Sequence, residues 1–393
     1  MLGAFVCRSI PPRRPAARYP GDKQMNTRTT IILFATIFLI GIFLIVILPF
    51  LLVKRSSPST PEATVSKKDE LTDQGIFRSD DEGITWEQKP WIEGKEGSIA
   101  PLRVNRLIQD PKDSDTLYLL TDGEGIWISR SRGDLWAKVV DRSGILNPNA
   151  NVLSLAVNPA NNREWFAAVF QGNRGRLLRT SDGGESFREV YFTPLERYGI
   201  FDVAYDKSRD AVLMVTGQGG LLETRDQGAT WRVVRWFADG LIRILVDPTN
   251  PSVIYVVSSR GSIFRTEDRG ASFADVTNDL RNYSGSTVHQ HWSMDSNGAI
   301  YLGSNYGIIR SRDHSRTYEA PPIIVPPDAL PILALAVDPS NVSRIMASAL
   351  NQLYVSQDDG DTWAIQPPPS TKRITQLLFG PKNSNIMYAV VQP

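Results

Sequence analysis

The stretch SQDDGDTW at residues 356–363 decides the fold, because close variants of this motif occur seven times in the chain. Each copy is built around a hydroxyl residue, Asp two positions later, Gly two after that, and then a hydroxyl and an aromatic residue. The other copies are SDDEGITW (79–86), SRSRGDLW (129–136), TSDGGESF (180–187), TRDQGATW (224–231), TEDRGASF (266–273) and SRDHSRTY (311–318). Their starts lie between 42 residues apart (224 to 266) and 51 residues apart (129 to 180). This is the spacing of one four-stranded propeller blade.

A second repeated unit lies between the boxes: an apolar run, a turn rich in Asp, Asn and Pro, and another apolar run. Its seven copies span 106–120, 154–169, 202–215, 243–257, 291–303, 334–348 and 376–390. Such pairs predict β-hairpins. The repeats begin with a box hairpin (75–90) and end with a strand pair (374–391). We therefore predict an all-β, seven-bladed propeller at 75–393, whose seventh blade joins both ends and leaves no open edge.

We interpret the boxes as structural, because a residue present in every blade serves to build blades. The carboxylate is expected to accept backbone N–H bonds across the turn, and the aromatic ring to pack between blades. The aspartates concerned are Asp81, Asp182, Asp226, Asp268, Asp313 and Asp358, whereas Ser131 replaces Asp in the second box and Ser315 replaces Gly in the sixth. The boxes lack the twelve-residue ligand spacing of a calcium loop, so we predict neither a metal nor a cofactor.

An uncharged, apolar segment at 30–53 exceeds the ~20 residues needed to cross a bilayer. The basic segment 1–29 precedes it and favours a cytoplasmic N-terminus. We thus predict a single-pass anchor in the cytoplasmic (inner) membrane, a flexible linker at 54–74 and an extracytoplasmic propeller. Two alternatives stay open: a cleaved signal peptide, and a true start at Met25, which begins a compact signal-anchor sequence.

Charge argues against nucleic acid as a partner. The whole chain has a net charge of +1, but residues 1–74 hold ten Lys/Arg and five Asp/Glu. The remaining residues therefore hold 33 basic and 37 acidic side chains, a net of −4. A slightly acidic domain lacks the basic surface that phosphate binding requires. The single cysteine, Cys7, leaves no disulfide for the repeats.

One position of the first strand in each blade is predominantly polar, and we expect it to form a ring near the channel mouth. It is occupied by Arg106, Ser154, Asp202, Arg243, His291, Ala334 and Gln376. The next position is uniformly apolar. A ring of non-identical polar residues fits a recognition site, and it equally fits the lining of a water-filled channel.

Loops opposite the boxes add arginines beside aromatic residues, a composition typical of protein interfaces. This predicted loop patch contains Arg174, Arg176, Arg197, Tyr198, Arg235 and Trp236. The alternative is that these are long surface side chains without a common target.

The seven boxes resemble those of the BNR or Asp-box repeat propellers, and the resemblance covers 75–393. Within that group the chain resembles most the photosystem II stability and assembly factors, which are exported seven-bladed propellers with an arginine-rich patch. Sialidases look similar in their boxes but have six blades and an Arg-Ile-Pro segment that this chain lacks. Xyloglucan-cleaving relatives look like two facing propellers. The anchor, and Asp202, His291 and Ala334 in the ring, depart from the assembly-factor pattern.

The resemblance implies a non-catalytic scaffold that binds a protein partner on the loop-bearing face and assists assembly of a membrane complex, and the apolar segment at 30–53 predicts that this scaffold is membrane-anchored. The alternative is a glycoside hydrolase or a carbohydrate-binding propeller. Hydrolysis requires two carboxyl groups ~5 Å or ~6.5–9.5 Å apart beside a sugar pocket. The carboxyls that could form such a pair are Asp202 with Asp122, Glu124 or Glu196.

Overall fold

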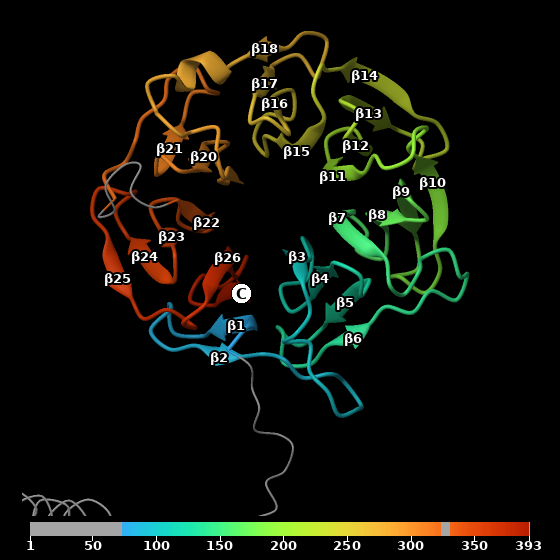
Figure 1. Cartoon of the computed structure of the whole chain (residues 1–393), viewed down its shortest axis with the longest axis horizontal. Helices are drawn as coiled ribbons and strands as arrows, with labels where there is room; N and C mark the ends of the chain where they lie inside the picture. Colours follow the sequence, from blue (N-terminus) through green and yellow to red (C-terminus); the bar gives the residue numbers. More distant parts are fainter. Residues whose placement is uncertain (1–72, 324–330, 393) are drawn as a thin grey trace, which may run out of the picture. The chain divides into compact units, whose positions relative to one another are not determined.

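The computed structural model describes residues 73–323 and 331–392, which form seven antiparallel sheets arranged in a ring (Figure 1). The seven-bladed, all-β propeller predicted from the boxes is confirmed. We number the blades in chain order from the first complete one. Blade 1 has β3 (Val104–Gln109), β4 (Leu117–Thr121), β5 (Ile126–Ser129) and β6 (Ala137–Lys138). Blade 2 has β7 (Asn151–Val157), β8 (Trp165–Gln171), β9 (Arg174–Thr180) and β10 (Arg188–Phe192).

The next four blades repeat this order. Blade 3 has β11 (Ile200–Asp206), β12 (Ala211–Thr216), β13 (Gly220–Thr224) and β14 (Arg232–Trp236). Blade 4 has β15 (Leu241–Val246), β16 (Ile254–Ser258), β17 (Ile263–Thr266) and β18 (Ala274–Asp275), followed by a 3₁₀ turn at Thr277–Leu280. Blade 5 has β19 (His291–Met294), β20 (Ile300–Gly303) and β21 (Ile308–Ser311). Blade 6 has β22 (Ile332–Val337), β23 (Ile345–Ala349), β24 (Gln352–Ser356) and β25 (Ala364–Gln366).

Blade 7 combines strands from both ends of the described chain. Its order is β2 (Glu87–Gln88), β1 (Gly75–Ser79), β27 (Met387–Gln392) and β26 (Arg373–Phe379). β1 and β27 run antiparallel, with Gly75 opposite Val391 and Ser79 opposite Met387. The Gln376 amide then bridges to blade 1, because its Oε1 accepts from the Leu107 N–H (2.8 Å) and its Nε2 donates to the Leu107 carbonyl (2.7 Å).

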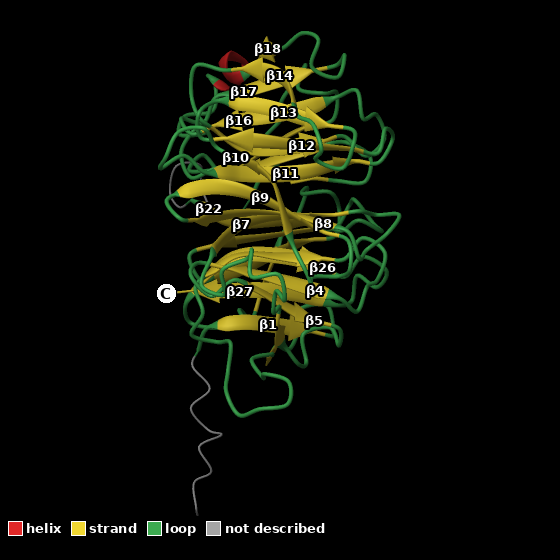
Figure 2. Ribbon diagram, turned by 90° about the vertical axis from the view of Figure 1, so that its right-hand side faces the viewer, coloured by secondary structure: helices red, strands yellow, loops and turns green. Residues whose placement is uncertain are grey.

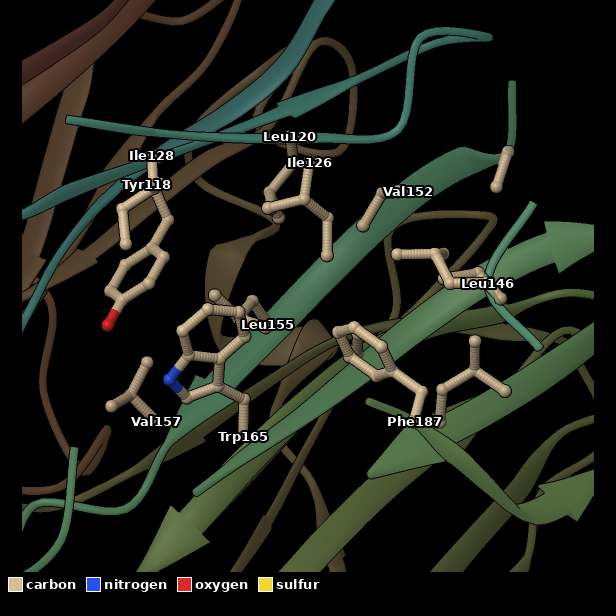
Figure 3. Close-up of a cluster of buried hydrophobic side chains, with 14 residues drawn as sticks. Tyr118, Leu120, Ile126, Ile128, Leu146, Val152, Leu155, Val157, Trp165 and Phe187 are labelled. Atoms are coloured by element: carbon tan, nitrogen blue, oxygen red, sulfur yellow. The ribbon is translucent and has the colours of Figure 1, made fainter. Parts of the chain in front are cut away.

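The hydrophobic core lies between neighbouring blades. The middle strands, such as β4 and β12, are buried at every residue, since each blade packs on both of its faces. Between blades 1 and 2 the rings of Tyr118 and Trp165 meet edge to face, 5.0 Å apart, and Phe187 of the third box joins them (Figure 3). The box aromatic thus belongs to an interblade core here.

Six of the seven box turns are held by their own carboxylate, and in the second box the Ser131 hydroxyl accepts from the Leu135 N–H instead (3.0 Å). In the first box, Asp81 accepts from the Thr85 N–H (2.8 Å) and the Thr85 hydroxyl (2.6 Å), and the Ser79 hydroxyl accepts from the Gly83 N–H (2.8 Å). Equivalent bonds lower the pKa of Asp226 to about 2, chiefly through the Thr230 hydroxyl. Matching carboxylate bonds occur at Asp182, Asp268, Asp313 and Asp358.

The box turns share one face with the turn between the first two strands of each blade. The Arg132 N–H of one box donates to the Asp115 carbonyl (2.8 Å), and the Asp359 N–H of another donates to the Ser343 carbonyl (2.7 Å). We call this the box face. The connections that enter the first strand of each blade lie on the opposite, loop-bearing face (Figure 2).

Arginines placed just before a box hydroxyl connect consecutive blades on the box face. Arg78 donates to the Arg132 carbonyl of blade 1 (2.9 Å), and Arg265 of blade 4 donates to the His314 carbonyl of blade 5. Arg310 of blade 5 reaches the Asp359 carbonyl and carboxylate of blade 6 (2.8 Å to the carboxylate). These interblade contacts were not anticipated from the sequence.

Blade 5 has three strands within the described residues, where the repeat spacing predicts four. Its outer side is closed only by an isolated bridge between Arg310 and Glu319. Pro321 and Pro322 follow directly, and proline has no N–H to donate to a strand ladder. The proline-rich sequence therefore explains why pairing stops after one bridge in the portion of this blade that the structure covers.

Replacing Ser315 by glycine is expected to stabilise the protein. Ser315 adopts a left-handed φ of 60°, where the other boxes have glycine, and its hydroxyl is buried without a hydrogen bond among the described residues. Relief of this strain should raise stability by about 1 kcal/mol and the midpoint of thermal unfolding by about 2 °C. The matched control is Gly360→Ser in blade 6, where a Cβ would lie 2.9 Å from Pro321 and should destabilise. A lower midpoint for Ser315→Gly would contradict the interpretation.

The predicted N-terminal segments fall outside the described residues: the cytoplasmic segment at 1–29, the anchor at 30–53, and the linker at 54–74 except its last two residues. Among the residues that the structure does describe, no helix is both long and apolar enough to span a bilayer.

Candidate binding site in the central channel

The seven inner strands β3, β7, β11, β15, β19, β22 and β26 surround the centre of the ring (Figure 1). They enclose a cavity of about 630 Å³. Five of the seven predicted ring positions line it: Arg106, Arg243, His291, Ala334 and Gln376. The residues directly before four of these positions also line it, namely Asn105, Ile242, Gln290 and Thr375.

Three members of this second set, Asn105, Ile242 and Thr375, were missed in the sequence because their exposure depends on β-bulges, whereas Gln290 directly precedes β19. The pairing register of an inner strand shifts just before the ring position in β3, β7, β11, β15, β22 and β26. A bulge places two consecutive residues opposite one partner residue and re-aims their side chains. Asn105 and Arg106 can therefore both face the cavity. Strict alternation of side chains does not apply at these bulges. No glycine at the bulged positions signals them in the sequence, so they could not be predicted from it.

Ser154 and Asp202 are buried, which corrects the prediction that they line the channel mouth. The physical reason is that their side-chain oxygens turn toward the next blade, where they accept hydrogen bonds from backbone N–H groups of the neighbouring inner strand. The Ser154 hydroxyl accepts from the Val203 N–H (3.4 Å), and Asp202 Oδ2 accepts from the Ile244 N–H (3.1 Å). Together with Gln376, these side chains connect one blade to the next. Half of the predicted polar ring is therefore structural.

Asp202 is held between two arginines from different blades. Its Oδ1 accepts from Arg106 Nη1 (2.7 Å) and from the Ser154 hydroxyl (2.7 Å), and its Oδ2 lies 3.6 Å from Arg243 Nη1. Burial alone would raise the pKa of Asp202, but Arg106 and Arg243 outweigh it and hold that pKa below its usual range. Asp202 is therefore ionised at neutral pH.

Arg243 is the cation that this network leaves partly unsatisfied. Burial, and then the neighbouring Arg106, lower its pKa to about 10, so it still carries its charge at neutral pH. Within the described residues its guanidinium makes no hydrogen bond, and its only ion pair is the long one to Asp202. Two arginines share one carboxylate, so the cavity holds an excess positive charge. This arrangement suits a carboxylate or another anionic group.

His291 adds no positive charge at neutral pH. Burial, followed by Arg243 and His289, lowers its pKa to about 4. Because an exposed histidine titrates near 6.5, the unfolded chain binds the proton first. The stability due to neutral His291 is thus present above pH 6.5 and is lost as the pH falls from 6.5 to 4.

Replacing His291 by glutamine is therefore expected to flatten the pH dependence of stability between pH 6.5 and 4. The wild-type free energy of unfolding should fall by about 2–3 kcal/mol more than that of His291→Gln over this interval. Urea unfolding at a series of pH values measures the two slopes. The comparison variant is His289→Gln, which removes only the last of the three causes and should keep most of the wild-type slope. Identical slopes for wild type and His291→Gln would contradict the assignment.

The predicted loop patch divides into anchored and exposed members. Arg174 donates to the Pro194 carbonyl (3.1 Å) and pairs with Glu196 (3.5 Å), and Arg176 pairs with Glu189. The Arg235 guanidinium lies over the rings of Phe237 and Phe273, 5.7 and 5.8 Å from their centroids. The exposed members are Arg197, Tyr198 and Trp236, together with a portion of Arg235. These positions lie on the loop-bearing face of blades 2 and 3.

The sequence profile of a family described as "Photosynthesis system II assembly factor YCF48" matches residues 161–380, more than half of the chain. The chain belongs to this family. As a YCF48-like propeller it is also similar to enzymes. A xyloglucanase of a Paenibacillus species is 23% identical over 342 residues, which cover 72% of this chain and 32% of that protein. Xyloglucanase Xgh74A of Acetivibrio thermocellus is 26% identical over 246 residues, 51% and 28% of the two lengths.

The chain thus spans about a third of the length of these curated relatives. Among solved structures it is similar to the GH74 xyloglucanase of Xanthomonas campestris, with a TM-score of 0.59 at 20% identity, covering 74% of this chain and 51% of the other. It is also similar to YCF48 bound to a D1 peptide, with a TM-score of 0.56 at 18% identity, covering 78% and 98%. At these identities the likeness establishes the fold alone.

No carboxylate of the YCF48-like propeller lines the central cavity within the described residues. The acids considered for a hydrolytic pair are engaged elsewhere: Asp122 with Arg103 (3.3 Å), Glu124 with Lys138 (2.7 Å) and Glu196 with Arg174 (3.5 Å). The described portion of the chain also contains no cluster of three or more His, Cys, Asp or Glu suited to a metal ion. The cavity therefore presents cationic and apolar side chains to a ligand.

Proposed function

We propose that this chain is a membrane-anchored, extracytoplasmic β-propeller that acts as a non-catalytic protein-binding scaffold in the assembly of a membrane complex. The proposal places the N-terminus in the cytoplasm and the anchor at 30–53 in the cytoplasmic membrane. One observation carries the binding role: Arg243 faces a cavity with its charge intact and no hydrogen-bond partner among the described residues. Membership of the assembly-factor family supports the same role.

The bound group is expected to be a peptide segment bearing a carboxylate. Arg243 would supply a charge-assisted bond to it. Ile242, Trp292 and Leu377 line the same cavity and would contact apolar side chains of the peptide. That a solved YCF48 binds a D1 peptide supports a peptide as the class of ligand. The particular partner of this chain is to be identified by capture.

Affinity capture from solubilised membranes tests the proposal. Replacing Arg243 by glutamine should reduce partner recovery at least about tenfold, since a charge-assisted bond contributes about 1.5–3 kcal/mol. The matched control is Arg269→Gln, an exposed arginine on the box face. A triple variant, Arg174→Glu with Arg197→Glu and Arg235→Glu, tests the loop patch separately. If Arg243→Gln and wild type recover the same proteins in the same amounts, the cavity is not the binding site.

The similarity to xyloglucanases keeps a second candidate, a glycoside hydrolase or carbohydrate-binding propeller, open to test. Under the scaffold proposal, the full chain should release no reducing ends from xyloglucan and show no binding to its oligosaccharides. Release that is abolished by Glu196→Gln or Glu124→Gln, with folding intact, would favour the hydrolase.

A further inference from the structure

The chain enters the propeller on the loop-bearing face. Asp73 accepts from the N–H (3.1 Å) and hydroxyl (2.6 Å) of Thr371, and Lys372 donates to Gln74 Oε1 (2.8 Å). Thr371 and Lys372 lie in the connection from β25 to β26, which belongs to that face. β27 ends there too, opposite Gly75, beside the C mark in Figure 2. The predicted linker is thus joined to the face that carries the loop patch and one end of the cavity.

The same face displays large apolar side chains to solvent. Leu195, Tyr198, Phe201 and Trp236, here named the aromatic arc, are 57, 41, 37 and 52% exposed. They come from the β10–β11 connection, the start of β11 and the end of β14, and glycines lie beneath three of them. Phe201 and Tyr198 both pack over Gly217, and Trp236 covers Gly220. Hydrogen bonds from Gly217 to Gly199 (2.9 Å) and from Phe237 to Gly219 (2.8 Å) join these loops.

Exposed arginines flank the arc without acidic partners. Arg197 and Arg235 are exposed and make no ion pair within the described residues. Trp and Tyr are the side chains that settle at membrane–water interfaces, and cations near an anionic bilayer surface gain electrostatic attraction. Arg197 and Arg235 adjoin Tyr198 and Trp236 in the chain, so both contributions come from the same loops.

We infer that the aromatic arc is a lipid-contact surface, by which the loop-bearing face rests on an anionic bilayer. The inference depends on the proposed anchor. In the linker predicted at 54–74, 19 residues precede Asp73, and a coil of that length would have a mean reach of about 25 Å. The inner strands, of four to seven residues, make the box face roughly 13–23 Å more distant than the loop-bearing face. The tether keeps the arc at a high effective concentration near lipid, so weak insertion suffices.

In this orientation a ligand would reach the cavity from the membrane side. The cavity is lined from Asn105 to Gln109, near the two ends of β3. Its loop-bearing end would face the membrane surface, so a segment of a membrane-embedded protein could enter there without crossing the propeller. A soluble partner would meet the arc only by displacing the bilayer. The attachment point of the linker therefore favours lipid over a soluble protein as the occupant of the arc.

The test uses the full chain with Cys7→Ser, reconstituted in nanodiscs of phosphatidylglycerol and phosphatidylcholine. A single cysteine at Ala238→Cys, beside Trp236, carries an environment-sensitive dye. The matched control is Ala160→Cys, an exposed alanine on the box face. Spin-labelled lipid should quench the dye at 238 at least about twofold more than the dye at 160, with quenching reduced by salt. Adding Tyr198→Ser and Trp236→Ser should bring quenching at 238 down to the control value.

Each other outcome would contradict the lipid contact of the aromatic arc in a distinguishable way. Equal quenching at both positions, or none at either, would overturn the lipid contact while leaving the anchor intact if the chain still floats with the discs. Quenching or protection at 238 that appears only after a membrane protein is added would assign the arc to that protein instead. A chain that does not float would refute the proposed anchor, and the inference with it. Circular dichroism of the serine variants establishes that they fold.

Discussion

Replacing Asp202 by alanine is expected to destabilise the propeller by about 3–5 kcal/mol, the cost of leaving buried charges without their counter-ion. Arg106 would lose its 2.7 Å bond, and Arg243 would lose its only ion pair within the described residues. The two guanidinium groups would then repel each other inside the cavity. The Ile244 N–H would also lose its acceptor, so the contact between blades 3 and 4 would weaken.

Equilibrium unfolding of the full chain in detergent measures this change. Asp122→Asn is the control, because the Asp122–Arg103 pair is largely solvent-exposed and should contribute at most about 1 kcal/mol. Adding Arg106→Met to Asp202→Ala should recover part of the loss, since it removes one unpaired charge. A loss below about 1 kcal/mol, or no recovery in the double variant, would show that the two arginines are not held by Asp202 in solution.

Replacing Arg310 by methionine is expected to cost about 3 kcal/mol, since it removes hydrogen bonds of a buried cation to two segments. Arg310 is 7% exposed and joins Glu319 (2.7 Å) to Asp359 (2.8 Å). Within the described residues Glu319 provides the only outer bridge of blade 5, and Asp359 belongs to the box of blade 6. Loss of Arg310 therefore weakens a three-stranded blade and its junction together.

Arg312 supplies a close control for this prediction. It pairs with the same two acids, Glu319 (2.9 Å) and Asp359, but its side chain is 45% exposed. Arg312→Met should cost less than about 1 kcal/mol, because exposed ion pairs contribute little. Comparable losses for both variants in urea unfolding would mean that burial does not distinguish these arginines. The hydrogen-bonded connection across the blades would then be unimportant for stability.

The repeated box predicted the fold because its information is local and redundant. Seven copies of one box, each lacking at most one of the Asp, Gly and aromatic residues, recur every 42 to 51 residues and predict seven turns of one kind, as in a ring of similar blades. The interblade role of Arg310 was not predicted, although the arginine stands just before its box. This role depends on the box turn of the next blade, which directs the Asp359 carbonyl toward the Arg310 guanidinium, and the sequence does not show that arrangement.

The candidate site was only partly predictable. The polar ring position identified Arg106, Arg243, His291 and Gln376 as cavity residues, and all four line it. Asp202 and Ser154 are instead buried, because the N–H groups of adjacent inner strands compete for their oxygens. Asn105 and Thr375 were missed because a bulge, and not strand alternation, turns them inward. The polarity of the side chains was sufficient to identify the ring position in each inner strand. Which group each side chain binds depends on the neighbouring strand, and the sequence does not show that.

The seam of blade 7 has a consequence for biosynthesis. β1 finds its partner β27 only after about 300 further residues have been made, which takes roughly 15–60 s at ordinary synthesis rates. During that time β1 can pair with β2, but its other edge has no partner strand. Folding of blades 1 to 6 can proceed meanwhile, since each pairs its own strands. The last strand to emerge thus completes the sheet begun by the first, and a chain that stops short of β27 cannot close its ring.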